Sequence, residues 1–194
     1  MVIHKRTGMT ASLYDRAAAS PNGVFTTRGA LEGPYGGLES LHSYGTIMLF
    51  AGGIGITHQL SHIYDLVRLY PSHTIATRRV VLVWTVRTTE HLEWVRPWMD
   101  TLLALPGRRA MLKILLFVTK PRSPREIVSP SATVCMFPGR PNAEVLIEKE
   151  MEERCGGMAV TVCGPGSLAD SVRAAVRERT YKGSVDFIGE SFTW

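Results

Sequence analysis

The chain has 194 residues, 45% of them hydrophobic and 20% charged, a composition typical of a soluble globular protein. Its net charge of +5 comes from scattered Lys and Arg residues without the aromatic–basic pattern of nucleic-acid binding, so no nucleic-acid partner is expected. Cys135, Cys155 and Cys163 lack C-x-x-C spacing, which argues against a disulfide framework and a zinc site and favours a reducing compartment. We see no N-terminal signal segment, and no apolar run approaches the roughly 20 residues of a membrane-spanning helix.

The first part of the chain is irregular and rich in glycine. We expect a short strand at residues 2–5, a loop that opens a helix in "GMTASLYDRAAAS", and a strand at residues 24–31 before a glycine-rich turn. The boundary is placed near Ser43, which gives one domain at residues 1–43 and a second at residues 44–194.

From residue 46 onward, segments with strand and helix patterns alternate. Strands are expected at residues 46–51, 79–86, 111–119, 132–137, 158–163 and 184–188. Helices are expected at residues 56–70, 90–105, 143–154 and 168–180, with a kink at Pro97. This alternation predicts an α/β fold in which a doubly wound parallel sheet carries helices on both faces. In such a sheet the ligand lies beyond the carboxyl ends of the strands.

Gly52, Gly53 and Gly55 stand between the first of these strands and its helix. Glycines at this place let backbone N–H groups and the helix dipole approach an anion such as a nucleotide pyrophosphate. The dinucleotide fingerprint G-x-G-x-x-G is incomplete, because His58 stands where its third glycine belongs. The alternative is a tight turn that only packs the helix on its strand. If the turn binds a nucleotide, a side chain at Gly53 or Gly55 is expected to obstruct it.

Two more strand ends carry residues that suit the same ligand. Arg87 follows the second strand of the alternation, where NADP enzymes usually present a basic residue and NAD enzymes an acid. It is either a ligand of a 2′-phosphate or an ordinary solvated arginine. Cys163 opens a second glycine turn, "CGPGS", and is either a small core residue or a contact of the nicotinamide ring. The histidines have no triad or metal-ligand spacing, so no metal site is expected.

Six segments resemble the C-terminal NAD(P)-binding part of the ferric reductase and NADPH oxidase family, within the ferredoxin–NADP reductase superfamily. The similarity is greatest to its fungal metalloreductase branch and extends from about Gly8 to Trp194. The segments are "EGPYGG", "LFAGGIGIT", "VLVWTVRTTEHLEWVRPWM", "GRPN", "VTVCGPGSLADSVR" and the terminal "ESFTW".

The resemblance implies an NAD(P)H-dependent flavin oxidoreductase, in which NADPH gives hydride to FAD and FAD reduces a metal ion or another acceptor. It implies NADPH contacts at Gly52, Gly53, Gly55, Thr57, Arg87, Arg140, Gly164 and Pro165. It places Cys163 against the nicotinamide, and Glu190 and Trp194 in the segment that covers the flavin ring. Gly8 and Thr10 match the loop and helix start that contact the FAD pyrophosphate.

The chain also departs from the family pattern. The flavin-ring motif, most of the flavin-binding β-barrel and the haem-bearing membrane helices have no counterpart, so residues 1–43 are expected to be a barrel remnant. An N-terminally truncated product, an incompletely read gene and a partner of a flavin- or haem-bearing membrane subunit are the three explanations considered. The alternative functions are a catalytically incomplete nucleotide-binding module and a doubly wound domain for another phosphorylated ligand.

Overall fold

The computed structural model describes residues 3, 5–30, 32, 39–183 and 185–189. The chain divides into two compact units, Met1–Glu39 and Ser40–Trp194.

The first unit contains one α-helix in its described part, α1 (Met9–Ala18), followed by a short 3₁₀ turn, η1 (Pro21–Gly23). The strand predicted at residues 24–31 was wrong over Val24 to Ala30, which form no regular structure. A strand needs a neighbour to pair its N–H and C=O groups, and the described part of this unit offers none. In the strand predicted at residues 2–5, Val2 and His4 lie outside the described residues, and Ile3 and Lys5 belong to no strand. The barrel remnant therefore stays a prediction.

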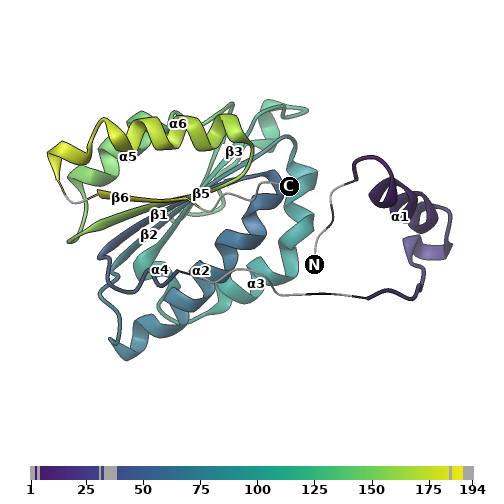
Figure 1. Ribbon diagram of the computed structural model, residues 1–194, viewed down its shortest axis with the longest axis horizontal. Coiled ribbons are helices and arrows are strands. Elements are labelled where there is room, and N and C mark those ends of the chain that lie inside the picture. Colours follow the sequence, from purple (N-terminus) through teal and green to yellow (C-terminus); the bar gives the residue numbers. More distant parts are fainter. Residues whose placement is uncertain (1–2, 4, 31, 33–38, 184, 190–194) are drawn as a thin grey trace. The chain divides into compact units, whose positions relative to one another are not determined.

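The described residues of the second unit form a six-stranded sheet in the order β4-β3-β2-β1-β5-β6 (Figure 1). Every neighbouring pair is parallel, which confirms the predicted doubly wound fold. The strands are β1 (Thr46–Gly52), β2 (Arg79–Val86), β3 (Leu112–Val118), β4 (Val134–Pro138), β5 (Met158–Cys163) and β6 (Val185–Gly189).

Helices cover both faces of this sheet. One face carries α2 (Ile56–Leu69) and α3 (Arg96–Ala104), with the one-turn α4 (Arg108–Met111) before β3; the other carries α5 (Ala143–Glu152) and α6 (Gly166–Arg177) (Figure 1). Alternate residues of β1 enter the two cores: Leu49 packs on the α2 side and Phe50 on the α6 side. Because both faces are covered, β1 is a continuous apolar run rather than an alternating one.

The predicted helix at residues 90–105 is instead two segments. A 3₁₀ segment, η4 (Thr89–Val95), precedes α3, and Pro97 lies in the first turn of α3. The predicted kink at Pro97 was therefore wrong. A proline in the first turn lacks only an N–H group that has no helical partner there, so it starts a helix without bending it.

The strand order changes direction between β1 and β5. From β1 the chain adds β2, β3 and β4 on one side and then returns to place β5 and β6 on the other. The helix after β1 and the helix after β5 therefore leave toward opposite faces. Such a switch point opens a crevice at the carboxyl ends of the two strands.

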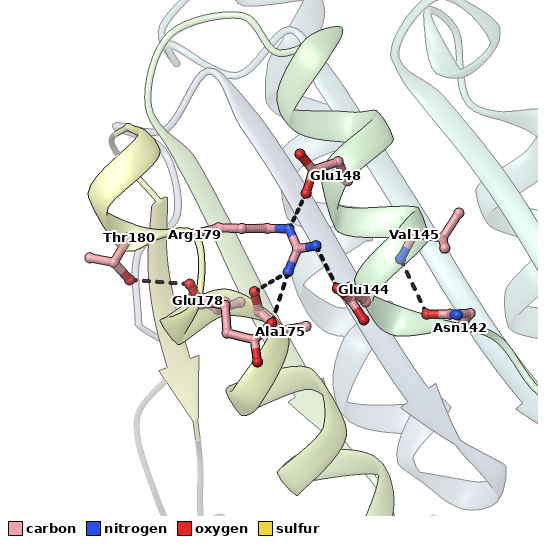
Figure 2. Close-up of polar contacts among 9 residues, drawn as sticks. Asn142, Glu144, Val145, Glu148, Ala175, Glu178, Arg179 and Thr180 are labelled. Atoms are coloured by element: carbon pink, nitrogen blue, oxygen red, sulfur yellow. Dashed lines mark hydrogen bonds and ion pairs between the residues drawn. The ribbon is translucent and has the colours of Figure 1, made fainter.

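Arg179 holds the two helices of one face together. Its guanidinium is almost fully buried, and it donates to Glu148 at 2.5 Å, to Glu144 at 3.2 Å and to the carbonyl of Ala175 at 2.9 Å (Figure 2). These contacts join the end of α6 to α5. They fix the direction in which α6 leaves the sheet.

Gln59 performs a similar role for α2 on the opposite face. Its side chain is completely buried, its Nε2 donates to the carbonyl of Phe50 at 3.1 Å, and its Oε1 accepts from the Thr161 hydroxyl at 2.9 Å. One side chain thus joins α2 to β1 and β5, the two strands that flank the switch point. An amide in this position satisfies polar groups that would otherwise be buried unpaired.

We predict that Gln59→Ala lowers the free energy of unfolding by about 2–4 kcal/mol, because it leaves the Thr161 hydroxyl unpaired and opens a cavity. Denaturant unfolding followed by circular dichroism measures this change. Ser61→Ala, on the exposed side of the same helix, is the matched control and should cost under about 0.5 kcal/mol. Equal losses in the two variants would contradict the role assigned to Gln59.

Candidate functional site

The candidate site lies at the carboxyl ends of β1 and β5. After β1 the chain makes a 3₁₀ turn, η2 (Gly53–Gly55), and passes directly into α2. After β5 it passes through Gly164 and Pro165 into α6. The amino-terminal ends of two helices, with their unpaired N–H groups, therefore begin at one switch point.

The two glycine turns pack against each other through their backbones. A Cβ atom on Gly52 would lie 2.5 Å from the Cδ of Pro165, and one on Gly164 would lie 2.9 Å from the Cα of Gly52. A Cβ on Gly55 would lie 2.1 Å from the carbonyl oxygen of Cys163. No side chain fits at these distances, so the absence of side chains lets β1 and β5 approach at this end.

Gly53 differs from its neighbours. Its φ of 56° lies in the left-handed region, and no atom lies within 4 Å of the position of its missing Cβ. Its carbonyl accepts a hydrogen bond from the Trp84 indole at 2.9 Å, so β2 supports the turn as well. The open side of this turn is therefore backbone alone, as an approaching anion requires.

Thr57 and Cys163 lie beside this turn. Thr57 stands in the first turn of α2, half-buried, and its hydroxyl donates to the carbonyl of Ile54 at 3.0 Å. Cys163 ends β5, half-buried, with its carbonyl against Gly55. The structure thus brings Thr57 and Cys163 together with the glycine turns, and the ligand contacts implied for both residues stay predictions.

Arg87 follows β2, one strand away from β1. It is exposed, and its guanidinium makes no hydrogen bond or ion pair with any residue in the described ranges. The nearest acid in sequence, Glu90, is instead paired with Arg122. The positive charge of Arg87 therefore remains available at the carboxyl edge of the sheet.

Arg140 lies farther along the same edge. It follows β4, after a turn in which Gly139, with a φ of 87°, donates its N–H to the carbonyl of Val118 at 2.8 Å. The strand β4 is three places from β1 in the sheet, which corresponds to about 14 Å at the usual strand spacing. The strand before Arg140 therefore lies nearer to β2, which precedes Arg87, than to β1, which precedes the first glycine turn.

The remaining predicted site residues belong to the first unit or lie outside the described residues. Gly8 and Thr10 belong to the first unit, where Gly8 precedes α1 with a φ of 64° and the Thr10 hydroxyl accepts from the N–H of Arg6 at 3.0 Å. Glu190 and Trp194 lie outside the described residues. The roles implied for these four residues stay predictions.

Two residues that support the site were not singled out from the sequence. Gln59 is a polar residue on the face of α2 that Ile56 and Ile63 bury, and such a position signals a buried hydrogen bond. Trp84 is an indole within a buried strand, whose N–H needs an acceptor. The sequence shows both of these features, but it does not identify the residue that completes either hydrogen bond.

Two histidines lie one turn apart on α2, the helix that begins directly after the glycine turn. The rings of His58 and His62 meet edge to face, with centroids 4.9 Å apart. Burial lowers the pKa of His62 to about 4, with a further lowering from His58 and a smaller opposing effect from Asp65. His62 is therefore neutral in the folded protein at neutral pH.

A parallel sheet with glycine turns at the start of two helices, at its switch point, is the architecture of a dinucleotide-binding domain. The model of the family described as the ferric reductase NAD binding domain matches residues 44–126 and 122–177. The chain belongs to the ferric reductase family, of which it carries the NAD-binding oxidoreductase domain. This confirms the family predicted from the sequence.

Several curated proteins are similar to the chain. Ferric reductase transmembrane component 6 of Saccharomyces cerevisiae is 24% identical over 92% of this chain and 26% of its own length. The probable cell surface ferric reductase kap2 of Aspergillus oryzae is 39% identical over 34% of this chain and 9% of its own length. Ferric reduction oxidase 8, mitochondrial, of Arabidopsis thaliana is 33% identical over 59% of this chain and 16% of its own length. The chain thus spans about a quarter or less of each of these relatives.

Among solved structures, the CS-b5R domains of human Ncb5or in the NAD⁺ form match with a TM-score of 0.50 and 16% identity. The match covers 74% of this chain and 36% of that chain, and it supports the fold. Within the described ranges, no helix is both long enough and apolar enough to cross a membrane.

We predict that Gly55→Ala lowers the free energy of unfolding by about 3 kcal/mol, because its Cβ would press on the Cys163 carbonyl and force β1 and β5 apart. Gly53→Ala should cost only about 1 kcal/mol, from its left-handed backbone. From the sequence, a side chain at Gly55 was expected only to obstruct a ligand. The structure shows that such a side chain would also disturb the packing within the protein. Denaturant unfolding of the two variants compares them, and similar losses would refute this distinction.

A second prediction concerns pH. The pKa of His62 is about 4 in the folded chain and 6.5 when unperturbed, so between these values the unfolded chain binds the extra proton. Stability should therefore be constant above about pH 6.5 and fall as the pH drops toward 4, by roughly 2 kcal/mol at pH 5. Unfolding of wild type and His62→Leu at pH 7 and pH 5 measures the effect.

In His62→Leu this contribution to the pH dependence should disappear. His73→Asn is the control, because His73 is exposed and its left-handed backbone, with a φ of 56°, suits asparagine. A His62→Leu variant that retains the full wild-type pH dependence would exclude His62 as the source.

Proposed function

We propose that this chain is the NADPH-binding part of a ferric-chelate reductase-type flavoprotein, which passes hydride from NADPH to FAD for reduction of a metal ion or another acceptor. The observation that carries the proposal is the backbone contact of the two glycine turns at the β1/β5 switch point. A bound nicotinamide would supply the hydride, and a flavin would take it up as two electrons and a proton and pass the electrons on singly, so the protein needs no nucleophile of its own.

The residues of the crevice fit a dinucleotide. The open backbone of Gly53 and the amino-terminal ends of α2 and α6 suit the pyrophosphate, with Thr57 beside them. Cys163, at the adjacent end of β5, suits the nicotinamide side together with Gly164 and Pro165.

The outer part of the same edge fits the phosphorylated ribose. Arg87 and Arg140 follow strands that lie on either side of β3, and both are cations. A guanidinium makes charge-assisted hydrogen bonds to phosphate oxygens. NADPH, with its 2′-phosphate, is therefore favoured over NADH.

The fit of FAD is less complete. Gly8 and Thr10 at the start of α1 offer one helix end, and the described part of the first unit contains no strand of a flavin barrel. Most of a flavin site would come from a flavin- or haem-bearing partner or from another part of the same protein. The names of the relatives, which include transmembrane ferric reductase components, support work at a membrane, and the proposal takes this chain to lie on the cytoplasmic side.

The same observation favours a second candidate, a nucleotide-binding module without its own flavin. The two candidate functions predict purified proteins of different colour. A purified chain with a flavin absorbance band that NADPH bleaches under anaerobic conditions supports the oxidoreductase. A colourless protein that binds NADPH but does not retain added FAD supports the module. A protein that binds neither nucleotide contradicts both.

We predict that Arg87→Ala weakens NADPH binding by roughly tenfold or more, because it removes a charge-assisted contact worth about 1.5–3 kcal/mol. NADH binding should be nearly unchanged. Calorimetric titration with each nucleotide measures the two affinities. Arg68→Ala is the control, since Arg68 is also exposed but lies in the last turn of α2, away from the glycine turn. Equal losses for NADPH and NADH in Arg87→Ala would rule out a 2′-phosphate contact.

A further inference from the structure

The loops that follow β2 and β3 are hydrogen-bonded to each other at the carboxyl edge of the sheet. The N–H of Thr119 donates to the carbonyl of Val86 at 2.9 Å, and the N–H of Lys120 donates to the carbonyl of Arg87 at 2.8 Å. The two loops are therefore hydrogen-bonded to each other through their backbones just past the strand ends, and the backbone of Lys120 contacts that of Arg87.

The acidic residues of these loops are already engaged. The Glu126 carboxylate accepts from the Thr89 hydroxyl at 3.2 Å and from the N–H of Arg122 at 3.3 Å, which joins the loop after β3 to the segment after β2. Glu90 pairs with the Arg122 guanidinium. Both carboxylates thus serve to hold the loops together.

The cations of the loops exceed these two acids by two charges, since Arg87, Lys120, Arg122 and Arg125 all lie here. Arg87 and Lys120 are exposed, and neither side chain has a hydrogen bond or ion pair within the described part of the chain. Arg122 is committed to Glu90, and Arg125 lies farther along the loop in η5 (Pro124–Glu126). Arg87 and Lys120 are therefore the adjacent pair of unneutralised cations.

We propose that Lys120 is a second specificity-determining residue, which together with Arg87 binds the 2′-phosphate of the nucleotide. The inference rests on the proposed function and deepens it. A phosphomonoester carries a charge of about −1.5 to −2 at neutral pH, which two cations match. Neighbouring strands lie about 4.8 Å apart, and the backbones of Lys120 and Arg87 are hydrogen-bonded, so two long side chains from these positions are close enough to share one phosphate group.

The backbone of Lys120 is restricted as well. Pro121 follows it, and the residue before a proline is held away from the helical region. The hydrogen bond to Arg87 and the Glu126 contacts restrict the loop further. Less freedom is therefore lost when Lys120 contacts a ligand.

The test uses the whole chain and two probes that differ only in the 2′-phosphate, adenosine 2′,5′-bisphosphate and adenosine 5′-monophosphate. In calorimetric titration, Lys120→Ala should weaken binding of the bisphosphate by about fivefold to tenfold and leave the monophosphate unchanged. Lys120→Arg should retain most of the affinity. Lys149→Ala, which removes an equally exposed lysine from α5, should change neither value.

The outcomes separate this inference from the proposed function. If wild type prefers the bisphosphate and Arg87→Ala reduces that preference while Lys120→Ala does not, the role of Lys120 is overturned and the proposed function stands. Equal weakening of both probes in Lys120→Ala also overturns it, because the effect would be general charge rather than recognition of the 2′-phosphate. If wild type binds neither probe nor NADPH, the proposed function itself fails.

Discussion

The candidate site depends on one constraint, the backbone contact between the two glycine turns at the ends of β1 and β5. The Cys163 carbonyl lies where a side chain on Gly55 would begin, and Gly52 occupies the equivalent place for Gly164. Two adjacent strands can send their helices to opposite faces here because the glycines leave no side chain of their own between the two turns. The amino-terminal ends of α2 and α6 therefore open on one crevice. Gln59 keeps α2 in place from within the core.

Charge is distributed differently at the two ends of β2. At the amino end, Arg79 donates to the buried carboxylate of Glu150 at 2.6 Å and 3.0 Å, so its charge is neutralised within the protein. At the carboxyl end, Arg87 has no such acid, and the acids near it hold loops together. The arginine at the amino end of β2 is therefore neutralised within the protein, whereas the one at the carboxyl end has no ion-pair partner among the described residues. The unneutralised charge lies at the same end of the sheet as the glycine turns.

Sequence patterns succeeded where the controlling physics was local. The apolar run that becomes β1 and the spacing of Ile56, Leu60 and Ile63 in α2 are short-range signals of a buried strand and an amphipathic helix. These patterns failed where contacts with residues distant in the sequence decide the local structure. Val24 to Ala30 have a strand-like composition without a neighbouring strand among the described residues, and Pro97 lies in the first turn of α3 rather than inside one longer helix.

The sequence by itself determined the alternation of strands and helices, the family, and the residue types at each strand end, because these follow from periodicity and short motifs. Only the tertiary structure decided which strand ends meet. It placed β5 beside β1, so that Gly55 contacts Cys163, and it set Lys120 beside Arg87. It also separated Arg140 from the glycine turns by the width of three strand spacings. Strand order is a property of long-range pairing and packing, which no local pattern in the chain encodes.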